Sequence, residues 1–65
     1  MDKNIGKSIQ AIRVKRGLTQ EELAKQADIK YTTLTKIESS VIKQPSVQIV
    51  AKIARALNIS IEELL

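Results

Sequence analysis

Hydroxyl groups are concentrated in one short segment of the chain. The segment YTTLTK, residues 31–36, holds one phenol, three threonine hydroxyls and one lysine ammonium. These groups donate and accept hydrogen bonds, and the lysine adds a positive charge. Tyr and Thr are mediocre helix formers, yet the neighbouring apolar residues recur at helical spacing. The segment therefore indicates a helix whose residue types serve contacts at its surface rather than helix stability.

Catalysis and metal binding lack their usual residues in this chain. There is no His and no Cys, so acid–base catalysis near neutral pH and zinc binding are both without their commonest groups. Ser, Thr and Lys are present, but no spacing pairs a nucleophile with a base. We therefore expect no enzyme activity and no cofactor or metal. Without disulfides, burial of apolar surface must hold the fold together.

The charge of the chain favours an anionic partner without identifying one. Eleven Lys and Arg stand against seven Asp and Glu, a formal net charge of +4. Five of the cations lie in the first sixteen residues, where Asp2 is the only acid, whereas Glu62 and Glu63 lie near the other end. Such a basic surface attracts nucleic-acid phosphates, but a solvated face that aids solubility is nearly as common. Charge alone leaves both interpretations open.

Neither a membrane span nor a secretory signal is indicated. A span needs about 20 mainly apolar residues, and charged residues interrupt every stretch of that length. The N-terminus, MDKNIGKSIQ, also lacks the apolar run of a signal peptide. We expect a cytoplasmic protein in which residues 1–65 form one domain with a modest core.

Periodicity and capping signals predict five helices and no strand. Gly17 is expected to end the first helix in a left-handed conformation, and Thr19 with Glu22 has the capping-box pattern for the second. Ser46 and Ser60 are good N-caps for the last two helices. The helices are predicted at about residues 4–16, 20–26, 31–39, 46–57 and 61–65. The resulting fold class is all-α, a compact five-helix globule, with Ile12, Leu23, Ala24, Leu34, Ile37, Val50 and Leu57 in its core.

Most of the chain resembles a known family. The stretch IGKSIQAIRVKRGLTQEELAKQADI, followed by PSVQIVAKIARALNISIEELL, is similar to the helix-turn-helix family of phage Cro and repressor proteins, with its lambda repressor-like DNA-binding domain. Ala24 falls where that motif needs a small residue, and Asp28 falls at its tight turn. Ile29, Leu34 and Ile37 match its buried anchors.

The chain departs from the family pattern in three places. Asp28 replaces the usual Gly of the turn, which is tolerable because Asp adopts left-handed conformations more readily than most residues. Ser39 and Ser40 stand where the family commonly has a Gly after the third helix, which weakens that C-cap. Val41 and Ile42 are apolar where many relatives are polar or basic, so they are expected to cover the core or to meet a partner.

The resemblance implies a sequence-specific DNA-binding transcriptional regulator, with a repressor as the expected type. In this family the second helix lies across the DNA backbone and the third enters the major groove. Carried over by position, the residues expected to read bases are Tyr31, Thr32 and Lys36, and those expected to contact phosphates are Gln20, Lys30, Thr33 and Thr35. Simpler roles are also open: Gln20 as a surface residue, and Tyr31 as a residue that packs against Ile29. Lys7, Arg13 and Lys43 are interpreted as solvated charges.

The expected partner is double-stranded DNA carrying a two-fold repeated operator, bound by a homodimer, with no small-molecule ligand. The candidate dimer surface comprises Val41, Ile42, Ile59, Ile61 and Leu65, although these residues could equally seal the core. A phage-type repressor, a restriction-modification controller and an antitoxin would share the same DNA chemistry. The alternative function is a protein-interaction module on the same fold, such as an antitoxin that binds a partner protein.

Overall fold

The computed structural model describes residues 4–65 and contains four α-helices followed by one short 3₁₀ helix. Residues 1–3, including Lys3 of the basic N-terminal segment, lie outside the described part of the chain. Over the described residues, no helix is both long and apolar enough to cross a membrane. The elements are α1 (Ile5–Lys15), α2 (Gln20–Ala27), α3 (Tyr31–Glu38), α4 (Val47–Leu57) and η1 (Ile61–Glu63).

The prediction of five helices was wrong, because the C-terminal segment forms a single 3₁₀ turn and no fifth α-helix. The backbone N–H groups of Glu63, Leu64 and Leu65 donate to carbonyls three residues earlier, at 3.1, 2.9 and 3.2 Å. A segment this short offers too few α-helical hydrogen bonds to offset the cost of nucleation. Its position is instead fixed by Leu64, whose side chain is fully buried in the core.

Local caps set the helix ends. The side chain of Asn4 accepts from the Lys7 backbone N–H at 3.1 Å, so α1 starts one residue later than predicted. At α2 the predicted reciprocal capping box is present: the Glu22 N–H donates to the Thr19 hydroxyl at 3.0 Å, and the Thr19 N–H donates to the Glu22 carboxylate at 2.9 Å. Asp28 follows in the left-handed region with φ of 57°. The connection between α2 and α3 consists only of residues 28–30.

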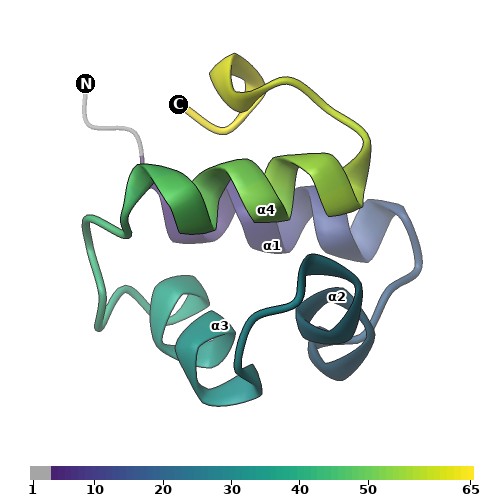
Figure 1. Cartoon of the computed structure of the whole chain (residues 1–65), viewed down its shortest axis with the longest axis horizontal. Helices are drawn as coiled ribbons and strands as arrows, with labels where there is room; N and C mark the ends of the chain where they lie inside the picture. Colours follow the sequence, from purple (N-terminus) through teal and green to yellow (C-terminus); the bar gives the residue numbers. More distant parts are fainter. Residues whose placement is uncertain (1–3) are drawn as a thin grey trace.

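The four α-helices pack around one apolar core. In Figure 1, α1 and α4 run side by side, α2 and α3 lie together on one side of that pair, and the C-terminal turn covers the other side. All but one of the predicted core residues are buried; Ile12 is only partly buried, because Ile9 takes the central position of α1. The core comprises Ile9, Leu23, Ala24, Ala27, Leu34, Ile37, Val50, Ile53, Ala54, Leu57 and Leu64.

Candidate nucleic-acid interface

Helix α3 has a buried face and an outward face with different chemistry. Leu34, Ile37 and Glu38 point into the molecule. Thr32 and Lys36 are exposed on other faces of the helix, and the Tyr31 side chain retains 47% of its accessible surface. Helical periodicity produces this division because positions three and four residues apart share a face. The three residues predicted to read bases are therefore accessible from solvent.

The residues predicted to contact phosphates are in less uniform surroundings. Lys30 is the exposed N-cap residue of α3, and its side chain makes no capping hydrogen bond. Thr33 and Thr35 are half-buried. The Thr35 hydroxyl donates to the backbone carbonyl of Thr32 at 2.9 Å. Because a phosphate oxygen accepts hydrogen bonds, Thr35 would have to rotate away from this carbonyl before it could donate to DNA.

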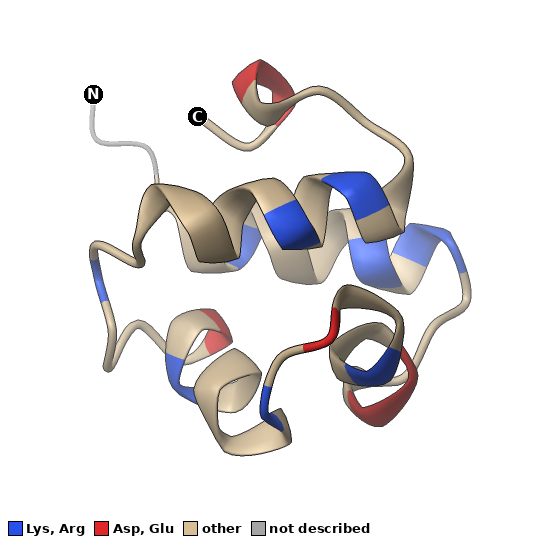
Figure 2. Cartoon of the chain, viewed as in Figure 1, with Lys and Arg blue, Asp and Glu red and all other residues tan. Residues whose placement is uncertain are grey.

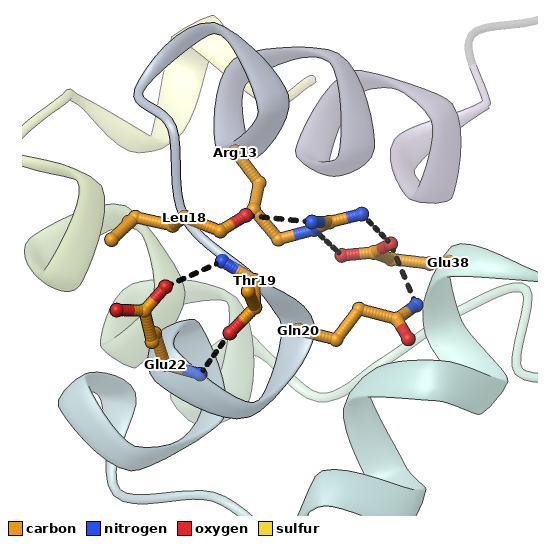
Figure 3. A network of polar contacts seen from close by, with 6 residues as sticks. All are labelled: Arg13, Leu18, Thr19, Gln20, Glu22 and Glu38. Atoms are coloured by element: carbon orange, nitrogen blue, oxygen red, sulfur yellow. Dashed lines mark hydrogen bonds and ion pairs between the residues drawn. The ribbon is translucent and has the colours of Figure 1, made fainter.

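Gln20, the first residue of α2, belongs to a network of polar contacts that joins three helices (Figure 3). Its Nε2 donates to Oε1 of Glu38 at 3.0 Å. The same carboxylate accepts from Nε of Arg13 at 2.8 Å and from its second guanidinium nitrogen at 3.1 Å. Arg13 also donates to the backbone carbonyl of Leu18 at 2.7 Å. The interpretation of Arg13 as a solvated charge was therefore wrong: its side chain is 11% exposed and ion-paired.

Sequence reasoning did not identify Glu38, although a signal was present. Leu34 and Ile37 are core anchors, and Glu38 follows at the spacing that puts it on the same helix face. A carboxylate on a buried face requires a charged or hydrogen-bonding partner. Nothing in the sequence identifies that partner as Arg13, which lies 25 positions earlier in the chain.

Cations are spread over all four α-helices and the loops between them, so charge alone does not single out one face (Figure 2). Helices α1 and α4 contain no acidic residue, and the only one on α3, Glu38, is buried and paired with Arg13. The exposed face of α3 therefore carries hydroxyls and a cation without a carboxylate to repel phosphates. Acidic groups lie elsewhere, including Glu22, whose pKa is lowered by the hydrogen bonds from the Thr19 backbone and hydroxyl.

Known proteins are similar to this chain in sequence and in architecture. An HTH-type transcriptional regulator of Archaeoglobus fulgidus is 41% identical over 56 residues, which are 86% of this chain and 79% of that protein. The crystal structure of SinR, the Bacillus subtilis master regulator for biofilm formation, in complex with DNA matches with a TM-score of 0.89 and 32% identity, over 92% of this chain and 95% of that one. The restriction-modification controller C.AhdI from Aeromonas hydrophila matches with a TM-score of 0.90 and 27% identity, over 97% and 94% of the two chains.

A family model described as helix-turn-helix matches residues 9–64, which include all of α2, α3 and α4. This match covers the capped α2, the left-handed turn at Asp28 and the outward face of α3. The chain therefore belongs to the helix-turn-helix family and is a DNA-binding transcription regulator.

Proposed function

We propose that this chain binds double-stranded DNA as a homodimer, with α3 of each copy in the major groove of one half of a two-fold repeated operator. The observation that carries this proposal is the outward face of α3, where Tyr31, Thr32 and Lys36 are accessible and no acidic side chain is exposed. Lys can donate to guanine O6 and N7, and Thr offers both a hydroxyl and a methyl that can touch the thymine methyl. These three residues are assigned to base edges.

Phosphate contacts are assigned to residues at the edges of that face. Lys30 stands exposed at the start of α3, and Gln20 stands at the start of α2. The free backbone N–H groups of a helix N-terminus add a partial positive charge that favours an anion. Thr33 and Thr35 complete the set, with Thr35 giving up its bond to the Thr32 carbonyl on binding. Such contacts hold the protein in register but carry no sequence information.

The dimer surface is assigned to three exposed apolar side chains, one in the loop before α4, one at the start of α4 and one at the C-terminus. Val41, Val47 and Leu65 retain 70%, 77% and 53% of their accessible surface. A groove of about 490 Å³ lies beside Val47 and Leu65 and is lined mostly by apolar residues, among them Ile5 and Pro45. Ile42 and Ile59 pack partly against the core and are less available, whereas Ile61, also partly buried, lines this groove.

The size of the molecule is compatible with this arrangement. Two half-sites on one face of DNA lie about 34 Å apart. The principal extents of the chain are 30, 21 and 20 Å, so two adjacent copies can place their α3 helices about one helical turn apart.

The test is selection of bound sequences from a random DNA pool, followed by binding of variants to a panel of singly substituted operators at fixed salt. A two-fold repeated motif is expected. Thr32→Ala should cost about 1–3 kcal/mol on the selected site and relax preference at one base pair per half-site. Lys30→Ala, the matched change at a phosphate-contacting residue, should weaken binding to all sequences by a similar factor. Recovery of no common motif would refute the proposal.

A second candidate function is a protein-interaction module, such as an antitoxin that binds a partner protein. The exposed apolar side chains of Val41 and Val47 favour it, because an isolated soluble domain gains nothing by exposing them. Sedimentation separates the two possibilities. A complex of two protein chains with one operator DNA supports the homodimer. A protein that is monomeric both free and on DNA would contradict the homodimer and favour binding of another protein at this surface.

A further inference from the structure

The Glu38 carboxylate is held in one position by groups from outside its own helix. Arg13 donates to both carboxylate oxygens, at 2.8 and 3.1 Å, and its remaining terminal nitrogen donates to the Leu18 carbonyl at 2.7 Å. The Glu38 side chain is 2% exposed. Helix α1 and the connection to α2 thus fix a negative charge at the C-terminal end of α3.

That fixed carboxylate determines which way the Gln20 amide is turned. A carboxylate only accepts hydrogen bonds, so the NH₂ group of Gln20 must face Glu38 and the amide oxygen must face away, as Figure 3 shows. An amide NH₂ group carries two hydrogens. One of them donates to Glu38 at 3.0 Å, and no residue within 4–65 accepts the other.

We propose that Glu38 is a positioning residue for DNA binding: it holds one N–H of the Gln20 amide so that the second N–H is directed at a DNA phosphate. This inference rests on the proposed function, because it assigns a phosphate to Gln20. A side chain already held in its binding orientation loses less freedom when DNA binds. Since Gln20 opens α2 and Glu38 ends α3, the same bond also sets the position of this donor relative to the groove-reading helix.

The test is a double-mutant cycle on DNA affinity with Gln20→Met and Glu38→Met, since Met at position 38 has no oxygen to accept the Gln20 N–H. Met matches the length of Gln but has no N–H. With Glu38 present, Gln20→Met should weaken DNA binding about three- to tenfold, the net effect of one hydrogen bond. In the Glu38→Met background the same change should have an effect close to onefold. The lost negative charge and any lost stability of Glu38→Met are common to both proteins of that background, so they cancel in the ratio.

The possible outcomes separate this inference from the proposed function. If the unaltered chain selects no DNA sequence, the proposed function fails and the inference fails with it. If the chain binds its operator but Gln20→Met costs the same factor in both backgrounds, or costs nothing, only the positioning role is refuted. Gln10→Met is a matched control, because Gln10 is exposed on α1 and is assigned neither to DNA nor to the dimer surface.

If Glu38→Met does not fold, a spectroscopic measurement on the unaltered chain provides the test instead. In a ¹⁵N-labelled sample, one Gln20 side-chain N–H should exchange slowly with water, whereas both hydrogens of the exposed Gln10, Gln26, Gln44 and Gln48 should exchange fast. On addition of operator DNA, the protected Gln20 hydrogen should keep its shift and the second should move. Equal exchange of both Gln20 hydrogens, or no shift of either on DNA, would overturn the proposal.

Discussion

Replacing Arg13 with Met should destabilise the fold far more than loss of a surface charge would. Arg13 and Glu38 are 11% and 2% exposed, so their ion pair is in the buried regime. Removing one partner of a buried pair typically costs about 3–5 kcal/mol, because the other charge is left without compensation. An exposed pair contributes only about 0–1 kcal/mol. A chain of this length is expected to have a total stability of about 3–10 kcal/mol, so Arg13→Met should lose a large fraction of the stability of the fold.

A second variant tests the cause of that loss. In Arg13→Met/Glu38→Met the orphaned carboxylate is gone, and two apolar side chains face each other where the ion pair was. Apolar replacements of a whole buried pair are often neutral or stabilising. The double variant should therefore be more stable than Arg13→Met alone, even though the Leu18 carbonyl and the Gln20 amide lose partners.

Urea denaturation followed by circular dichroism measures all of these stabilities. Arg16→Met is the control, since Arg16 is exposed at the end of the same helix and carries the same charge. Its loss should change stability by about 0.5 kcal/mol or less. The reasoning is refuted if Arg13→Met costs no more than Arg16→Met, or if the double variant is less stable than the single one.

Three further changes test other parts of the structure. Gly6→Ala would place a Cβ against the backbone carbonyl oxygen of Ile37, so it should cost about 1–3 kcal/mol; an unchanged melting temperature would contradict this close approach of α1 to α3. Ser40 has φ of 68°, so Ser40→Gly should be more stable than Ser40→Ala by about 1–2 kcal/mol in thermal melts, and equal stabilities would argue against a left-handed residue. The lowered pKa of Glu22 predicts that the ionised side chain stabilises the fold at pH values above its ordinary pKa of 4.5. This contribution is lost as the pH falls through the lowered pKa of the folded state. Glu22→Gln keeps a capping-box residue but does not titrate, so its stability difference from the unaltered chain should disappear in acid; a difference that is constant with pH would exclude this linkage.

The outward face of α3 was predictable, whereas the contacts of the site were not. Once Leu34 and Ile37 are recognised as core anchors, the 3.6-residue period places Thr32 and Lys36 on other faces. That argument needs only one helix. Gln20 differs, because its amide is oriented by Glu38, 18 positions later in the chain. No local pattern specifies a contact between the start of α2 and the end of α3.

The sequence by itself determined the four α-helices and the caps discussed here, since these depend on residues three to five positions apart, but not the 3₁₀ form of the C-terminal turn. The capping box of Thr19 and Glu22 and the left-handed Asp28 are contacts and conformations of this local kind. Only the tertiary structure decided that Leu64 is buried in the core and that Arg13 forms an ion pair with Glu38. Those choices depend on how α1, α3 and the C-terminal turn pack. A buried carboxylate accepts whichever donor the packing brings within reach, and linear spacing does not encode which donor that is.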